Sequence, residues 1–175
     1  MRLWGRGYGD DAMEIRNALQ RRSVVRAEIK TYAMLPLRLV VGYGFLAHGL
    51  AKWLKGPAAF AYILHAMDVP APHLMAWTTI AVEVLGGIAI IAGAFVSLVS
   101  IPAIVLLAVA IITTHLPYGF STIKLMSFSN GRAHFGPPGY ECDLLYIACL
   151  VALALSDPTP WSFDAYRSRE ERPER

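Results

Sequence analysis

The sequence predicts an all-α membrane protein, a four-transmembrane-helix bundle with an N-terminal amphipathic surface helix. Two observations predict this fold class. The residues AVILMFWYC make up 55% of the 175-residue chain, whereas Asp, Glu, Lys and Arg make up only 17%, well below the quarter that is usual in soluble domains. Only eight charges fall within residues 39–156, and the rest lie in the two ends. This pattern excludes a disordered chain, a coiled coil, a nucleic-acid module and an ordinary cytosolic enzyme.

Four apolar stretches each approach the ~20 residues that a helix needs to cross the hydrocarbon layer, although the last is slightly short. Because backbone groups in lipid must hydrogen-bond within their own segment, each span must be helical. Buried helices of a soluble bundle are a poor alternative, since the third stretch lacks a polar face. The four expected spans are residues 32–53, 74–95, 98–116 and 139–156.

Aromatic and basic residues predict how the spans are oriented. Lys and Arg are concentrated before residue 32 and after residue 161, so both termini are expected in the cytoplasm. The loops after the first and third spans then face outward. Aromatic residues bracket the spans as interfacial belts do: Tyr32 and Trp161 at the inner interface, and Trp53, Trp77, Tyr118 and Tyr140 at the outer one.

The N-terminal tail is expected to form an amphipathic helix on the inner leaflet, because Ile15, Leu19, Val25 and Ile29 recur at near-helical spacing among arginines. A solvated tail is the alternative. A signal peptide is disfavoured, because the first apolar run comes late, is long and lacks a small-residue cleavage site. The chain thus divides into a basic tail at 1–31, a transmembrane domain at 32–156 and a charged cytoplasmic tail at 157–175.

Ionisable side chains within the spans gather in the expected outer half of the bilayer. A charge at the centre of a span costs about 2.5–3.5 kcal/mol, so such groups persist when they are paired, hydrated or needed for function. We therefore predict a polar cluster with a functional role and without a metal. Its predicted catalytic residues are His48, Glu83, His115 and Asp143, and its predicted cofactor contacts are Arg38, Lys52 and Glu141.

Glu83 is expected to point into the bundle, because small residues share its helical face and let a neighbouring helix approach closely. At about 1.5 Å of rise per residue, His48 lies within one helical turn of the depth of Glu83. A contact between Glu83 and His48 is therefore the first pairing expected, with Arg38 as the alternative partner. The competing interpretation is structural: ion pairs only connect the helices, and Lys52 extends to the headgroups.

Five short motifs in these segments resemble the DoxX family, and together they cover residues 35–165. The first span, RLVVGYGFLAHGLAKW, has the arginine, the glycine-rich stretch and the H-G-x-x-K ending of that family at Arg38, Gly42, His48, Gly49 and Lys52. The other matches are V-E-x-x-G-G at Glu83, Gly86 and Gly87, H-x-x-x-G-F at His115, Gly119 and Phe120, G-x-E-x-x-L at Gly139, Glu141 and Leu144, and W-S-x-D at Trp161, Ser162 and Asp164.

The resemblance implies a four-helix protein of the bacterial inner membrane. It also implies similarity to the DoxD subunit of a thiosulfate:quinone oxidoreductase and to membrane oxidoreductase assemblies linked to thiol and oxidative stress. The first functional hypothesis is accordingly a membrane subunit of a quinone-linked redox system, in which the His and carboxylate groups relay protons. Haem held by His48 and His115 is disfavoured, because their estimated depths differ by about one turn.

Two other functions stay open, and so does whether the chain is an enzyme at all. A non-catalytic scaffold or accessory subunit would use the polar cluster only for packing. A small-solute or ion pathway would need oligomers, because four short helices enclose little lumen. The expected partners are membrane lipid and either a partner subunit or further copies of the chain, and not nucleic acid. The loop at residues 117–138 carries a Ser-Asn-Gly turn signal and is long for a simple connector, which suggests a function.

Overall fold

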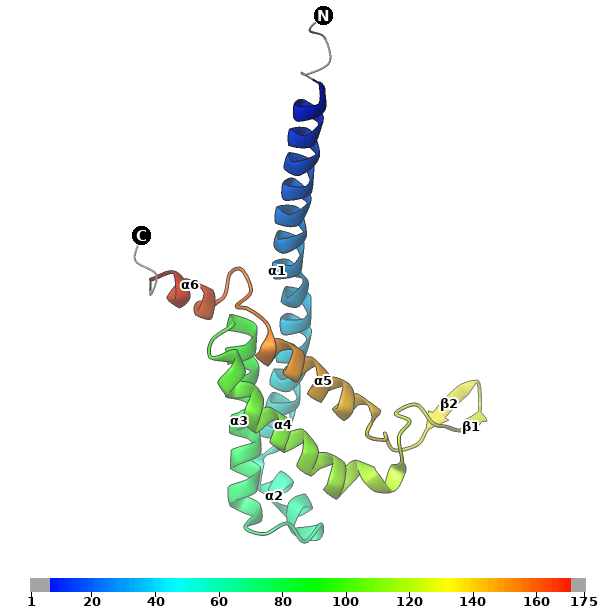
Figure 1. Ribbon diagram of the computed structural model, residues 1–175. Coiled ribbons are helices and arrows are strands. Elements are labelled where there is room, and N and C mark those ends of the chain that lie inside the picture. The colour runs from blue at the N-terminus through cyan, green and yellow to red at the C-terminus, as the bar shows by residue number, and fades with distance from the viewer. Residues whose placement is uncertain (1–6, 171–175) are drawn as a thin grey trace, which may run out of the picture.

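The structure, a computed structural model, describes residues 7–170, with side chains placed at residues 13–25 and 32–170. Helices dominate it (Figure 1). In chain order the elements are α1 (Gly7–Lys55), α2 (Pro57–Ala66), α3 (Pro72–Ala92), α4 (Val96–Ala110), the π-helical turn η1 (Ile111–His115), the 3-10 turn η2 (Leu116–Tyr118), β1 (Leu125–Ser129), β2 (Arg132–Phe135), α5 (Glu141–Leu155) and α6 (Phe163–Glu170).

The first helix does not break at the expected membrane boundary. α1 runs through 49 residues and past Pro36, and its first half extends as a single rod away from the other helices (Figure 1). Between Gly9 and Pro36 the sequence has no glycine or proline and is rich in strong helix formers. A helix in the N-terminal tail is therefore present. The prediction that it forms a separate surface helix is corrected, because it continues the axis of the first span.

Among the residues that the structure describes, three helical segments are long and apolar enough to cross a membrane: Tyr32–Lys55, Pro72–Ala92 and Val96–Tyr118. They coincide with the first three predicted spans to within a few residues, and the chain is a membrane protein with several apolar helices. α5 has only 15 residues, or about 22 Å at 1.5 Å per residue, which is shorter than the ~30 Å hydrocarbon core. The fourth span therefore stays a prediction.

α1 and α3 pack with their backbones almost in contact. A Cβ atom added at Gly87 of α3 would lie 2.6 Å from the backbone nitrogen of Leu46, and one added at Gly42 would lie 2.9 Å from the carbonyl oxygen of Gly87. Seven residues along the same face of α1, a Cβ at Gly49 would lie 2.8 Å from the Cβ of Glu83. The prediction that small residues bring a neighbouring helix close to Glu83 is confirmed.

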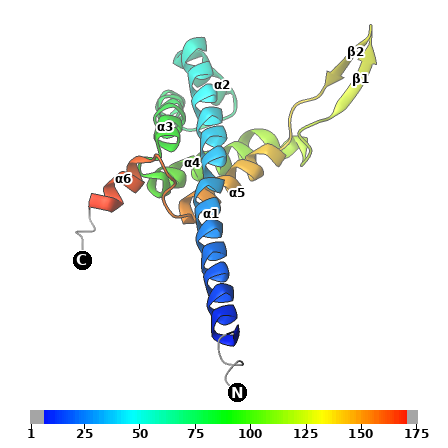
Figure 2. The ribbon, with the colours of Figure 1, turned by 90° about the horizontal axis from the view of Figure 1, so that it is seen from above.

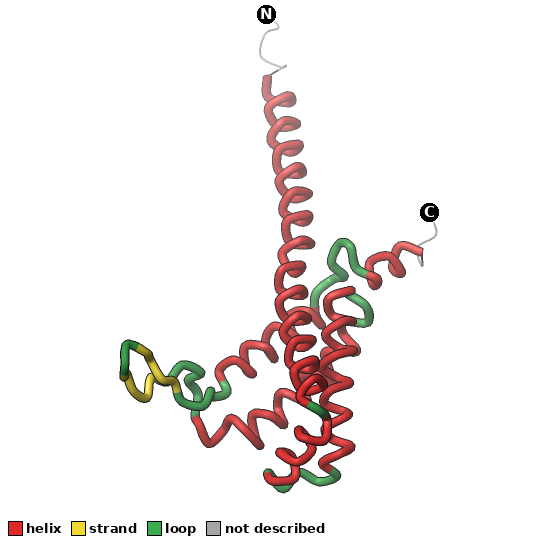
Figure 3. Tube along the Cα trace, turned by 180° about the vertical axis from the view of Figure 1, so that it is seen from behind, coloured by secondary structure: helices red, strands yellow, loops and turns green. Residues whose placement is uncertain are grey.

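The apolar core lies where α1, α3, α4 and α5 meet. Away from it the helices separate into two pairs, because α1 packs chiefly on α3 and α4 chiefly on α5. Figures 1 and 3 show α4 and α5 side by side, running away from α1 and α3 toward the β-strands. A closed four-helix bundle is therefore not confirmed. The buried residues of the core are Val41, Phe45, Ile90, Ala103, Leu150 and Leu153.

Aromatic contacts mark the two ends of the membrane part of α1. The rings of Tyr32 and Trp161 lie 6.0 Å apart, centroid to centroid, and those of Trp53 and Trp77 lie 6.3 Å apart. Each contact joins residues that the sequence analysis assigned to the same interface. The grouping of these aromatic residues into two belts thus agrees with their positions in the fold.

The segment after α5 folds back on the helices instead of leaving them as a free tail. Thr159 and Ser162 are buried in it. Asp164 accepts hydrogen bonds from the backbone N–H groups of Phe95 at 2.8 Å and Val96 at 3.1 Å. A carboxylate at this position satisfies donors that a helix N-terminus leaves unpaired. The first part of the expected charged tail therefore belongs to the helical domain.

The long loop between α4 and α5 contains a β-hairpin, which the sequence analysis did not predict beyond its turn. β1 and β2 are antiparallel and joined by Asn130 and Gly131, whose φ angles are 50° and 71°. Positive φ at both central residues, filled by Asn-Gly, is typical of a two-residue hairpin turn. Figure 2 shows the hairpin standing apart from the helices.

Candidate functional site

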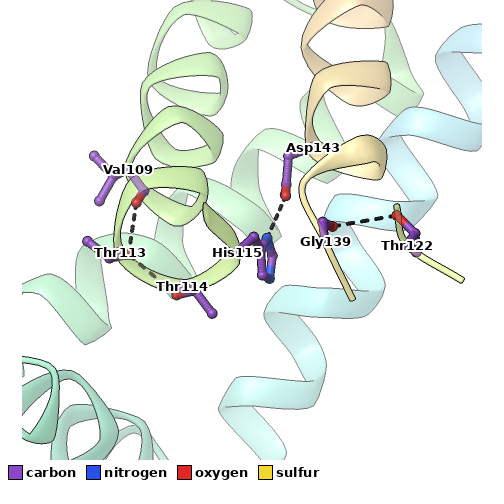
Figure 4. Close-up of polar contacts among 7 residues, drawn as sticks. All are labelled: Val109, Thr113, Thr114, His115, Thr122, Gly139 and Asp143. Atoms are coloured by element: carbon purple, nitrogen blue, oxygen red, sulfur yellow. Dashed lines mark hydrogen bonds and ion pairs between the residues drawn. The ribbon is translucent and has the colours of Figure 1, made fainter. Parts of the chain in front are cut away.

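One titratable pair bridges the ends of α4 and α5. His115 is the last residue of η1, and Asp143 lies in the first turn of α5. Nδ1 of His115 lies 2.5 Å from Oδ2 of Asp143 (Figure 4). The His115 side chain is 25% exposed and that of Asp143 is 11% exposed. The pair therefore combines a shielded carboxylate with an imidazole that a ligand can reach.

The helix carrying His115 changes geometry at this point. η1 is a π-helical turn, a feature that is rare and frequent at functional sites. Within it, the hydroxyl of Thr113 donates to the carbonyl oxygen of Val109 at 2.8 Å, and Pro117 then prevents a regular continuation. In Figure 4 the turn carries the His115 ring to the side that faces α5.

A clamp at the base of the hairpin holds these two helix ends together. The backbone N–H of Thr122 donates to Oε2 of Glu141 at 3.0 Å. Gly139 is buried, and a Cβ atom there would collide with the carbonyl oxygen of Gly119. Glu141, a predicted cofactor contact, is exposed and has this loop N–H as its partner. Its role in the structure is to fix the loop.

A second pair connects α1 with α3. Nζ of Lys52 lies 2.6 Å from both carboxylate oxygens of Glu83, with side-chain exposures of 25% and 6%, and 5.4 Å from the centroid of the Phe60 ring. The predicted Glu83–His48 contact was therefore wrong. His48 is exposed on α1, and Lys52, one turn further along, has the length and the charge to reach Glu83.

Arg38, the alternative partner for Glu83, lies at the opposite end of the membrane part of α1. It is only 3% exposed and donates from Nη1 to the hydroxyl of Thr159 and from Nη2 to the carbonyl oxygen of Trp161 at 3.3 Å. With Asp164 it lines a cavity of about 340 Å³. Its prediction as a partner of Glu83 was wrong, because it binds the segment that follows α5.

The predicted cluster thus divides into separate units. His115 lies with Asp143, Glu83 lies with Lys52, and His48 contributes to neither pair. Within the described part of the chain, no hydrogen bond or ion pair joins the two pairs. Nor do three His, Cys, Asp or Glu side chains gather there as metal binding would require. The His115–Asp143 pair is the best candidate for proton chemistry, because its histidine is partly exposed.

Comparison with known proteins agrees with the motifs. Residues 33–116 match the family model described as DoxX. Residues 33–116 carry a DoxX domain. No curated protein and no solved structure matches it. The matched segment covers the membrane part of α1, then α2, α3 and α4, and it reaches the histidine of the candidate site.

The structure shows what several of the DoxX-like motif residues do. Glycines of the first two motifs form the close contact between α1 and α3, and Glu83 and Lys52 connect the same helices. Asp143, the partner of His115, lies outside the matched residues. It had been predicted as a site residue because it is an ionisable side chain at the outer start of the fourth expected span.

Some residues of the inner end escaped the sequence analysis. Thr159, which binds Arg38, follows a proline in an irregular segment, and no periodicity or spacing distinguishes it. Asp164 did carry a signal, since it is the last residue of the W-S-x-D motif. The motif by itself does not indicate that the carboxylate caps α4.

Proposed function

We propose that this protein, with its DoxX domain, is a membrane subunit of a quinone-linked redox system, in which His115, held in place by Asp143, exchanges a proton with the quinone. The 2.5 Å contact between Nδ1 and Oδ2, with the imidazole partly exposed at the ends of two helices, supports the proposal. A quinone needs hydrogen-bond donors at its carbonyl oxygens and a route for protons. An imidazole held by a carboxylate supplies both.

The proposed proton transfer follows from the orientation of the ring. In the proposed orientation Nδ1–H of His115 donates a hydrogen bond to Oδ2 of Asp143, so Nε2 is the nitrogen that faces the quinone oxygen. An imidazole oriented in this way can take up a proton at Nε2 and pass it to the reduced oxygen. Reduction of one quinone to quinol consumes two electrons, supplied by a redox partner protein, and two protons. His115 passes one proton, and water at the membrane surface supplies the other.

A non-catalytic scaffold is the second candidate, and the Lys52–Glu83 pair favours it. That pair lies beside the close glycine contact of α1 and α3, where an ion pair between helices serves packing without any ligand. In this alternative the His115–Asp143 pair has the same purpose for α4 and α5. The two candidates differ in what the loss of each pair does to quinone binding.

We also propose that the protein lies in the bacterial inner membrane with α5 as a fourth span and both termini cytoplasmic. The basic residues before residue 32 and after residue 161 support this orientation. The quinone site would then lie near the outer surface. Electrons would reach it through a partner subunit or through further copies of the chain.

The decisive experiment is a titration of the protein in lipid nanodiscs with short-chain ubiquinone and menaquinone analogues. Loss of one hydrogen bond of about 1.4 kcal/mol corresponds to a tenfold change in Kd. We therefore expect His115→Ala and Asp143→Asn to weaken saturable binding about tenfold. Thr113→Val on the same π turn is the matched control and should bind as the parent does.

The scaffold alternative makes the opposite prediction. If no saturable binding is found, or if His115→Ala binds the analogues as well as Thr113→Val and only unfolds at a lower temperature, the redox proposal is wrong. Glu83→Gln adds a second comparison. It should lower the unfolding temperature without changing the Kd of the analogue.

A further inference from the structure

The β1–β2 hairpin has one apolar and one polar face. Residues paired across two strands share a face, and neighbours along a strand alternate between faces. The register shift at Met126 keeps Leu125 opposite Phe135, so the alternation holds on both sides of it. The apolar face is formed by Leu125, Phe128, Ala133 and Phe135, and the polar face by Ser127, Ser129, Arg132 and His134.

The apolar face of the hairpin is exposed. Phe128 is 71% exposed and Phe135 is 61% exposed, and every residue of both strands is exposed. An isolated two-stranded hairpin is at best marginally stable in water. Aromatic side chains that no other part of the described chain covers therefore indicate that another molecule covers this face of the hairpin.

The position of the hairpin favours a membrane as the cover. It leaves the helices after Tyr118, where the third membrane-spanning segment ends. In Figures 1 and 3 it extends to the side of the helices and does not continue past the end where α2 lies. If the end of this span marks the level of the membrane surface, a hairpin that runs sideways from it lies along that surface.

The charges of the loop favour anionic lipid. Residues 117–140 include Lys124 and Arg132 and contain no Asp or Glu. Nζ of Lys124 lies 6.0 Å from the centroid of the Tyr118 ring, and this combination of a basic and an aromatic side chain is typical of the headgroup region. Basic residues near a bilayer are attracted to anionic headgroups.

We infer that the hairpin docks on the membrane surface beside α4 and α5, with its apolar face against the acyl-chain boundary and Lys124 and Arg132 toward anionic phosphate headgroups. The hairpin then anchors the clamp formed by Thr122, Gly139 and Glu141. This inference does not depend on the proposed redox function, because a scaffold would use the same anchor.

Site-directed fluorescence on the full chain tests the docking. In a Cys142→Ser/Cys149→Ser background, an environment-sensitive dye is attached to Ala133→Cys on the apolar face or to Ser127→Cys on the polar face. The protein is placed in nanodiscs of phosphatidylglycerol and phosphatidylcholine. We expect spin-labelled lipid to quench the dye on Ala133→Cys several-fold more than the dye on Ser127→Cys, and aqueous iodide to show the reverse order.

The lipid charge supplies a second comparison. Lys124→Gln/Arg132→Gln should reduce the lipid quenching of the Ala133→Cys dye in phosphatidylglycerol nanodiscs more than in nanodiscs of phosphatidylcholine alone. Equal access of iodide to both labelled positions would overturn the inference. A dye on Ala133→Cys that neither quencher reaches would also overturn it, because a second copy or a partner protein would then cover the face.

Discussion

Gly87 on α3 lies against the backbone of α1 at Leu46, so close that a Cβ atom would come within 2.6 Å of the Leu46 nitrogen. This close approach has an electrostatic consequence at Glu83, one helical turn before Gly87 in α3. With the two helices so near each other, Nζ of Lys52 reaches both carboxylate oxygens of Glu83 at 2.6 Å. The two glycines of the V-E-x-x-G-G motif differ in this respect, since only Gly87 meets the neighbouring backbone.

Gly87→Ala is expected to destabilise the protein by about 1–3 kcal/mol, the usual range for overpacking a close contact. The added methyl group would meet backbone atoms, which cannot rotate away. Thermal unfolding in detergent, followed by circular dichroism, measures the effect. Gly86→Ala is the control, because its Cβ would meet only a side-chain methyl group of Val99 at 3.3 Å. Equal unfolding temperatures for the two variants would contradict the close-contact account.

The two halves of the Lys52–Glu83 pair should respond unequally to substitution. Lys52→Met leaves the carboxylate of Glu83 buried without its partner, a loss that costs about 3–5 kcal/mol for a fully buried pair. The cost is smaller here because Lys52 is 25% exposed. Glu83→Gln leaves an ammonium that can extend toward water, so it should cost less.

The double variant Lys52→Met/Glu83→Gln separates pairing from packing. If the pair acts as an ion pair, the double variant should unfold at a higher temperature than Lys52→Met alone. Additive losses in the double-mutant cycle would indicate that the two side chains contribute independently. The cycle can be measured by the same thermal unfolding, in one detergent and at one pH.

Asp164→Ala should destabilise the protein by about 0.5–2 kcal/mol, the usual cost of losing a helix N-cap. Asp164→Ala removes the acceptors of the Phe95 and Val96 N–H groups. Asp164→Asn keeps one acceptor oxygen, so its loss of stability should lie between that of the parent and that of Asp164→Ala. Chemical unfolding in a mild detergent provides the measurement. Asp157→Ala, at a neighbouring exposed position, is the control and should behave as the parent does. Indistinguishable curves for Asp164→Ala and Asp157→Ala would argue against the cap.

Alkaline phosphatase fusions test the proposed orientation. A fusion joined at Asn130, in the hairpin turn, should be active because the loop faces outward, whereas a fusion after the last residue should be inactive. Enzyme activity in intact bacteria, normalised to the amount of fusion protein, is the measurement. An inactive fusion at Asn130 would reverse every assignment of depth and would place the His115–Asp143 pair near the inner surface.

The elements that a single physical constraint governs are the most predictable from the sequence. Hydrocarbon length and backbone satisfaction predicted the first three membrane helices, and the small residues of α1 and α3 predicted their close packing. The partner of Glu83 was not predictable from depth alone. His48 is near the same level, but which side chain points at α3 depends on helix rotation, and rotation is set by the glycine contacts. The split of the helices into two pairs also depends on packing between distant segments.

The irregular parts were harder to predict, because their structure depends on single backbone contacts. Asn130 and Gly131 predicted a turn. The strands on either side are short and solvent-exposed, so their hydropathy pattern did not predict them. The binding of Arg38 by Thr159 joins residues 121 positions apart, beyond any local signal. In contrast, His115 and Asp143 were both named from the sequence as site residues, and the structure brings them together.

The unbroken course of α1 has a mechanical consequence. From Gly7 to Tyr32 the helix rises about 37 Å at 1.5 Å per residue, more than the thickness of the hydrocarbon core it joins. A protein that binds the N-terminal end of this helix would lie well clear of the lipid. A tilt of the helix would then act first on the contacts of Arg38, six residues after Tyr32, and only further along the span on the glycine contacts with α3 and the Lys52–Glu83 pair.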